Sequence, residues 1–183
     1  MTGQAITMAA AGGRLREDAR ERLGVLFDAH HQRLYRLARR LSGSADDARD
    51  LVQETFLRAA RAPESIPGEK PAEEAWLVRV LINICRDRWR KSCVRKRAVP
   101  DPNRGAEAVS TPESAAIARA TVWRALARLS PRRRAIVVMY EIEGAAVPAI
   151  AALLGVTPVT VRWHLSRGRR ELAAALGTEW RSR

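Results

Sequence analysis

Apolar residues recur at helical spacing along almost the whole chain, and this periodicity constrains the fold more than any other feature. In the first run they return every three or four positions, at Leu23, Leu26, Phe27, Leu34, Leu37 and Leu41. No segment shows the alternation of apolar and polar residues that is typical of a half-buried strand. The pattern therefore predicts an all-α protein.

Glycine, proline and capping residues divide this helical pattern into separate helices. Gly43 ends the first helix, and Ser44 with Asp47 predicts a capping box for a second helix that stops before Pro63. A turn-rich loop follows, and a third helix runs from Trp76 through Trp89.

Between residues 92 and 112 the helical pattern is lost. Prolines and a glycine interrupt this polar stretch, at Pro100, Pro102, Gly105 and Pro112. Such composition predicts a flexible linker, whose roughly 20 residues could span at most about 70 Å. We therefore predict two small helical domains, 20–92 and 113–183, joined by a linker at 93–112 and preceded by a disordered tail at 1–19.

The second domain ends in the pattern of a helix-turn-helix. After a helix that Ser130-Pro131 caps and starts, residues 147–154 predict a short helix, Gly155 a tight turn, and Thr157-Pro158 the start of a last helix. The start of such a second helix commonly contacts DNA bases, and arginines further along contact phosphates. The candidate DNA-contacting residues are Thr160, Arg162, Trp163, His164, Arg167 and Arg169. A solvated basic face on a core helix is the alternative.

The third helix ends in a cluster of cations around an aromatic ring. Trp89 is surrounded by Arg86, Arg88, Arg90, Lys91, Arg95, Lys96 and Arg97. Cations and rings together suit a single-stranded nucleic acid, because charge follows its phosphates and a ring stacks on its bases. Asn83, Asp87 and Arg90 share one face of this helix. A buried tryptophan beside a solvated arginine run would explain the pattern equally well.

The second helix has an acidic face on an otherwise basic protein. Asp50, Gln53 and Glu54 lie opposite an apolar face formed by Leu51, Val52 and Phe56. An acidic face is a poor surface for DNA and a suitable one for docking a protein. A simple solvated face is the other interpretation.

Charge favours a polyanionic partner. With 33 Lys and Arg against 20 Asp and Glu, the formal net charge is +13, which suits nucleic acid or an anionic membrane surface. No apolar run approaches the roughly 20 residues of a membrane-spanning helix, and the N-terminus lacks a signal-peptide pattern. We expect no membrane insertion and a cytoplasmic protein.

The sequence offers no catalytic constellation. The two cysteines, Cys85 and Cys93, are eight residues apart and have no histidine nearby to complete a zinc site. No nucleophile, metal or Gly-rich phosphate motif can be assembled from the chain. We therefore predict that the protein is not an enzyme and binds no cofactor or metal.

Two ordered motifs resemble bacterial RNA polymerase sigma factors. The segment from Ala48 to Phe56, followed by Trp76-Leu77, Asn83, Asp87 and Arg90, is similar to their second conserved region. The segment 126–176 resembles their fourth region, through Leu129-Ser130-Pro131, Arg134, Gly144, Leu154-Gly155, Thr160-Val161-Arg162 and Arg169. A chain with only these two regions and a bare linker resembles the extracytoplasmic-function (ECF) group.

This resemblance implies a function and a role for each motif. An ECF sigma factor binds core RNA polymerase and directs promoter-specific initiation. The second helix would dock on the coiled coil of the polymerase largest subunit, through Asp50, Leu51, Gln53 and Glu54. The third helix would contact the melted minus-ten element through Asn83, Arg86, Asp87 and Arg90, with the loop 63–72 beside a flipped base. The last helix would contact the duplex minus-thirty-five element through Thr160, Arg162, Trp163, His164, Arg167 and Arg169. An anti-sigma factor is expected from the resemblance alone.

Several positions depart from the family pattern. Arg49 stands at a usually acidic position, and Ala149 replaces a common Glu. Trp163 and His164 occupy places often held by small or basic residues, which predicts a promoter preference of its own. Gly168 replaces a usual alanine, at a cost of about 1 kcal/mol in helix propensity.

Two other functions remain compatible with the motifs. One is a helix-turn-helix regulator that binds duplex DNA without polymerase, against which only the acidic second helix and the basic third helix argue. The other is a sigma mimic that titrates an anti-sigma protein, which the intact basic last helix disfavours.

Overall fold

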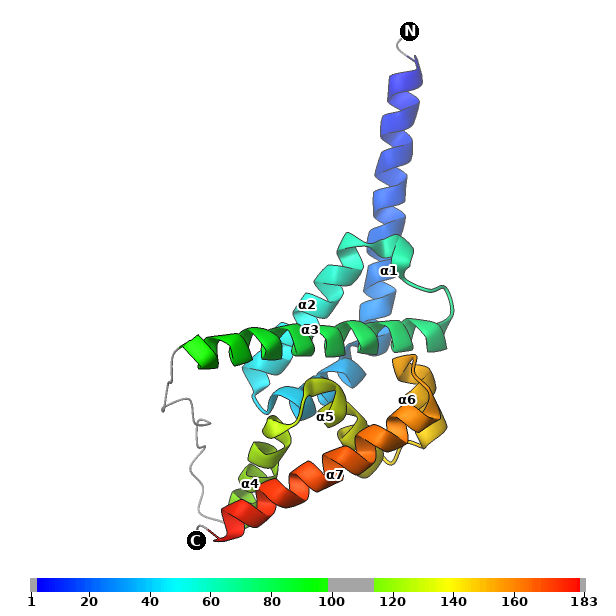
Figure 1. Ribbon diagram of the computed structural model, residues 1–183. Coiled ribbons are helices and arrows are strands. Elements are labelled where there is room, and N and C mark those ends of the chain that lie inside the picture. The colour runs from blue at the N-terminus through cyan, green and yellow to red at the C-terminus, as the bar shows by residue number, and fades with distance from the viewer. Residues whose placement is uncertain (1–2, 99–113, 182–183) are drawn as a thin grey trace.

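Seven α-helices make up the ranges 3–98 and 114–181 that the computed structural model describes, and within these ranges there is no strand (Figure 1). The predicted all-α fold is therefore confirmed. The N-terminal domain consists of α1 (Gly3–Ser42), α2 (Ala45–Arg61), a 3₁₀ turn (Pro63–Ser65) and α3 (Lys70–Ala98). The C-terminal domain consists of α4 (Ser114–Arg128), α5 (Pro131–Val137) with a π-helical turn (Val138–Ile142), α6 (Val147–Leu154) and α7 (Pro158–Arg181).

The helix boundaries of the N-terminal domain follow from its capping residues. Gly43, with φ of 80°, makes the turn after α1, and the Ser44 hydroxyl accepts a hydrogen bond from the Asp47 amide at 3.4 Å. Helix α2 buries the apolar face that its spacing predicted, and packs with α1 and α3 around Leu34, Leu77 and Leu81. Ser44 is thereby confirmed as the N-cap residue of α2.

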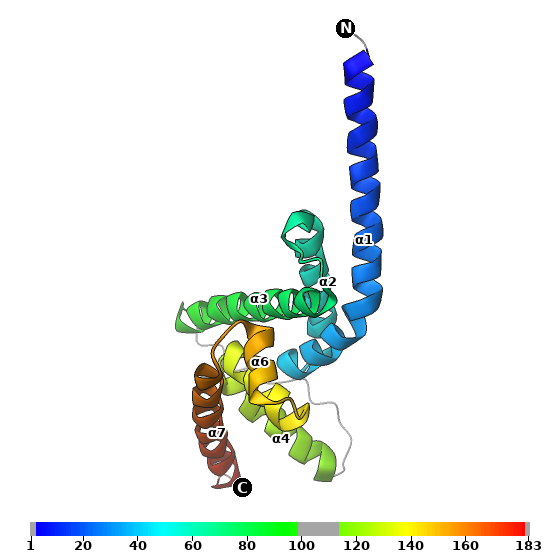
Figure 2. The ribbon, with the colours of Figure 1, turned by 90° about the vertical axis from the view of Figure 1, so that its right-hand side faces the viewer.

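Two helices run further than the sequence pattern suggested. Helix α1 begins at Gly3 rather than after the predicted tail 1–19, and its N-terminal half projects away from the other helices (Figure 2). Alanines at 5 and 9–11 favour this helix. Helix α3 continues to Ala98, since no glycine or proline interrupts the chain before Pro100. The rest of the predicted linker, 99–112, lies outside the described residues.

The C-terminal domain contains the predicted helix-turn-helix. Helices α6 and α7 are joined through Gly155, which adopts a left-handed conformation with φ of 63°, and the Thr157 hydroxyl caps α7 by accepting from the Thr160 amide at 3.2 Å. At α5 the predicted side-chain cap is absent. Ser130 contributes only its carbonyl, which accepts from the Arg134 amide at 2.9 Å.

Close packing of α5 against α7 explains the glycine at position 168, and the sequence did not reveal it. Helices α5 and α7 approach each other so closely that a Cβ atom at Gly168 would lie 2.7 Å from Cγ2 of Val137. The glycine therefore permits this contact, and its low helix propensity is offset by the packing.

The two domains, whose relative placement the sequence did not predict, pack against each other. Helix α3 contacts both α5 and α6, and α1 contacts α5 (Figure 1). The buried apolar residues of the two domains form one continuous core. Polar contacts cross the boundary. Arg134 donates to the Leu41 carbonyl, Arg79 donates to the Leu153 carbonyl at 3.3 Å, and Arg40 pairs with Glu143 at 2.5 Å.

Candidate nucleic-acid interface

The outer face of α7 combines exposed cations with exposed apolar side chains. Val161 and Leu165 are buried and fix the inner face of the helix. On the outer face Arg162 is exposed, and Trp163 is 55% exposed. An exposed arginine near the N-terminus of the second helix of a helix-turn-helix is placed to contact base edges in a major groove.

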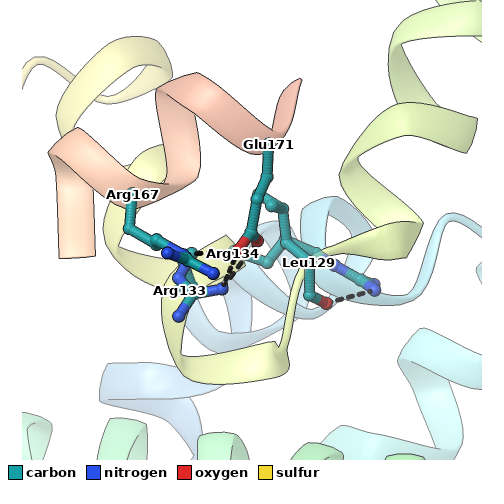
Figure 3. A network of polar contacts seen from close by, with 5 residues as sticks. All are labelled: Leu129, Arg133, Arg134, Arg167 and Glu171. Atoms are coloured by element: carbon teal, nitrogen blue, oxygen red, sulfur yellow. Dashed lines mark hydrogen bonds and ion pairs between the residues drawn. The ribbon is translucent and has the colours of Figure 1, made fainter. Parts of the chain in front are cut away.

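A polar network ties α7 to α5 (Figure 3). The Nη1 atom of Arg133 lies 2.8 and 2.6 Å from the two carboxylate oxygens of Glu171, and Arg167 Nε lies 3.1 Å from one of them. Burial opposes ionisation of this carboxyl, but the hydrogen bonds from both arginines outweigh it, so the pKa of Glu171 lies below its ordinary 4.5. The network holds α7 against α5, and Arg167 uses one of its hydrogen-bond donors within it.

His164 faces the protein interior more than the solvent. It is half-buried, and its Nδ1 atom has no hydrogen-bond partner. Burial first, and the charges of Arg133 and Arg132 second, hold the pKa of His164 below its ordinary 6.5. The imidazole is therefore neutral at pH 7 and packs edge-on against Trp163, with ring centroids 4.9 Å apart. This placement argues against the predicted base contact.

Two other predicted DNA contacts have partners within the domain. Arg169 donates to Glu141 at 2.7 Å, which raises the pKa of Arg169, and its guanidinium lies 5.3 Å from the Tyr140 ring centre. The Thr160 hydroxyl lies 2.9 Å from that of Thr157, beside the helix cap. Of the six predicted side chains on α7, Arg162, Trp163, Arg167 and Arg169 are exposed, and the two last each pair with a glutamate.

The predicted face of α3 is continuous but only partly exposed. Arg90 is exposed, whereas Asn83, Arg86 and Asp87 are half-buried. Arg86 Nε lies 3.9 Å from Asp87 Oδ1, too far for a hydrogen bond. Trp89 is 37% exposed beside them, so a ring and cations do share this surface.

Helix α2 presents part of the predicted docking face. Asp50 and Gln53 are exposed, and Glu54 pairs with Arg58 at 3.1 Å. Leu51 is only 3% exposed and belongs to the core, because its position on the helix turns it toward α1 and α3. The prediction that the Leu51 side chain contacts a partner does not fit this structure. Leu57, 42% exposed on α2, was not anticipated.

Other residues that shape the α7 surface were not predicted from the sequence. Val159 is 70% exposed, four residues before Trp163 on the same face, and the spacing alone could have indicated the pair. The roles of Arg133 and Glu171 depend on a contact between two residues 38 positions apart in the chain, for which the sequence has no signal.

Fold and surface together define the class: a helical, helix-turn-helix DNA-binding protein with an additional helical domain. Residues 26–93 match the Sigma-70 region 2 family and residues 119–172 match the Sigma-70 region 4 family. The ECF RNA polymerase sigma factor SigM of Mycobacterium tuberculosis is 36% identical over 153 residues, which cover 83% of this chain and 76% of SigM.

Two solved structures have a similar fold. The complex of CnrH, a sigma factor of Cupriavidus metallidurans, with the cytosolic domain of CnrY aligns with a TM-score of 0.56 and 26% identity, over 90% of this chain and 96% of CnrH. The Bartonella quintana sigma factor RpoE, in complex with the anti-sigma factor NepR, aligns with a TM-score of 0.54 and 25% identity, over 88% and 98% of the two chains.

The chain belongs to the ECF RNA polymerase sigma factors. It is a transcription regulator that binds RNA polymerase and directs promoter-specific initiation. Among the helices of the described residues, none is long and apolar enough to span a membrane. The same residues contain no cluster of three or more His, Cys, Asp or Glu side chains able to hold a metal ion.

Proposed function

We propose that this sigma factor binds its partners through three separate surfaces, on α2, α3 and α7. Exposed Asp50 and Gln53 of α2, with Glu54 beside them, dock on the coiled coil of the polymerase largest subunit. The observation that carries the proposal is the presence, in one chain, of this exposed acidic face and of an exposed basic face on α7. Opposite charges on different helices suit a protein that binds polymerase and DNA together.

The two DNA elements would be held in different states. Helix α3 contacts the unpaired strand of the minus-ten element through Arg90, with Asn83, Arg86 and Asp87 on the neighbouring surface and Trp89 available for stacking. Helix α7 contacts the duplex minus-thirty-five element through Arg162, Trp163 and Arg167.

Simultaneous binding requires the two domains to separate. The two elements lie about 25 base pairs apart, or about 85 Å at 3.4 Å per base pair. In the packed arrangement Arg79 hydrogen-bonds to Leu153. This contact keeps Asn83, one turn along α3, within about 35 Å of the start of α7. The packed arrangement is therefore the form of the protein that is not engaged with a promoter.

Run-off transcription with purified core polymerase tests the assignment of surfaces. Asp50→Arg should abolish binding to core polymerase without changing thermal stability, because the side chain is exposed. Asp28→Arg makes the same charge change at an exposed position of α1 and serves as the matched control. Full polymerase binding by Asp50→Arg would refute the docking face.

The upstream contact is tested at single base pairs. Arg162→Ala should lower initiation selectively at one position of the minus-thirty-five element, since a bidentate arginine contact discriminates bases by about 1–3 kcal/mol. Equal loss on every upstream sequence would make Arg162 a phosphate contact instead.

We also propose an anti-sigma factor as a partner class. Both structural relatives described above are sigma factors solved in complexes, one of them with a named anti-sigma factor. In this chain a cavity of about 610 Å³ lies between α1, the start of α3 and α6. A purified anti-sigma domain that binds the chain should inhibit run-off transcription, and a bound domain without effect on transcription would contradict this role.

A further inference from the structure

Two large apolar side chains stand exposed on the DNA-facing side of α7. Val159 is 70% exposed and Trp163 is 55% exposed, among the most exposed large apolar side chains of the described residues. Their spacing of four residues places them on one face, about 6 Å apart along the helix axis. Arg162 and Arg167, both exposed, flank this apolar pair. The pair therefore lies inside a basic surface and not beside the core.

The Trp163 ring is held in a defined orientation. The Arg133 guanidinium lies 5.7 Å from the ring centre, and both oxygens of Glu171 fix that guanidinium. The Trp163 ring also packs edge-on against the half-buried His164, at an interplanar angle of 75°. A side chain already ordered in the free protein loses little conformational freedom when it binds.

We propose that Val159 and Trp163 recognise the 5-methyl groups of thymines in the upstream promoter element. The thymine methyl is the one apolar group that base pairs present in the major groove, and apolar side chains are its usual contacts. A separation of about 6 Å along the helix corresponds to nearly two base-pair steps of 3.4 Å. The preferred element should thus carry two thymine methyls one or two base pairs apart, on either strand.

This inference rests on the proposed role of α7 and adds which chemical group of the DNA it recognises. The flanking arginines and the net charge of +13 favour DNA over a protein as the occupant of this surface. An apolar protein partner on the same face is the alternative, and it would leave the methyl groups without influence.

Deoxyuridine substitution isolates the methyl group, because it removes that group and changes no hydrogen bond. Holoenzyme formed from the full chain and core polymerase first selects upstream elements from a randomised promoter library. In the best promoter each thymine of the element is then replaced singly by deoxyuridine, and run-off transcription is measured below saturation. Wild type, Val159→Ala and Trp163→Ala are compared, with Arg162→Ala as a control for lost charge contacts.

We expect two deoxyuridine positions to lower initiation by wild type about fourfold each, the effect of leaving one methyl unburied. Trp163→Ala should lose sensitivity at one position and Val159→Ala at the other, whereas Arg162→Ala should keep both. Both variants should fold normally, because neither side chain is in the core.

Two results would overturn methyl recognition while leaving the proposed function intact. Either wild type initiates equally well on thymine and deoxyuridine, or both alanine variants keep the wild-type sensitivity to deoxyuridine. A wild type that directs no initiation from any template would overturn the proposed function, and this inference with it.

Discussion

Charge reversal at Glu143 should loosen the packing between the two domains. Glu143 Oε1 lies 2.5 Å from Arg40 Nη1, and both side chains are mostly shielded, with 21% and 32% of their surfaces exposed. Loss of such a pair costs about 1 kcal/mol, and like-charge repulsion in Glu143→Arg adds a similar amount. A total of about 2 kcal/mol raises the ratio of separated to packed molecules about 30-fold.

The Cys85 thiol on α3 can report this separation. Burial raises the pKa of Cys85 from 9.0 to about 11, while the charges of Arg134 and Arg88 act in the opposite direction. Because Arg134 belongs to the other domain, Cys85 lies close to the boundary. At pH 8 a return of the pKa to 9.0 increases the thiolate fraction about 90-fold. A thiolate with a lower pKa is intrinsically less nucleophilic, and this reduces the gain in reaction rate about eightfold.

Alkylation of Cys85 at pH 8 should therefore accelerate severalfold in Glu143→Arg, up to about tenfold if the population is fully separated. Peptide mass spectrometry follows Cys85 and Cys93 in the same sample, and Cys93 should be unaffected. The exchanged pair Arg40→Glu with Glu143→Arg should restore the slow rate, and Glu64→Arg controls for the change in net charge. An unchanged Cys85 rate, or acceleration that persists in the exchanged pair, would refute the reasoning.

Three further predictions concern α7. Gly168→Ala should destabilise the protein by about 1–3 kcal/mol in urea unfolding despite its better helix propensity, because its Cβ would meet Val137 at 2.7 Å. Gly177→Ala on the same helix, with no atom within 4 Å of the added Cβ, should instead stabilise it by up to about 1 kcal/mol. The lowered pKa of Glu171 means that its ion pairs contribute stability above pH 4.5, and that this contribution is lost as the pH falls through the lower folded value. The fall in urea stability between pH 6 and pH 3 should accordingly be smaller in Glu171→Gln than in wild type. Thr157→Ala removes the α7 cap and should cost about 1 kcal/mol in thermal unfolding, and an unchanged melting temperature would contradict that role.

Local features of the fold were determined by the sequence itself. The periodic apolar residues predicted the helices, and Ser44, Gly155 and Thr157 predicted caps and turns that the structure confirms. These features depend on residues within one or two turns of each other, so short-range spacing contains the information. The two ordered motifs were likewise enough to predict the sigma-factor family.

The surfaces were decided only by the tertiary structure. Periodicity could not say which outward residues of a motif remain free: Leu51 is buried in the core, His164 is half-buried, and Arg169 pairs with Glu141. Each outcome depends on a partner distant along the chain.

The packing of the domains is the clearest case. The proline-rich stretch predicted a linker between two domains but not how they are placed, and in the structure Arg134 donates to the Leu41 carbonyl 93 residues away and the apolar core is continuous across both. Burial of apolar surface between helices depends on their shape and relative placement in space, which no local pattern specifies. The sequence determined what each helix is, and the tertiary structure determined which of its side chains remain available to DNA and polymerase.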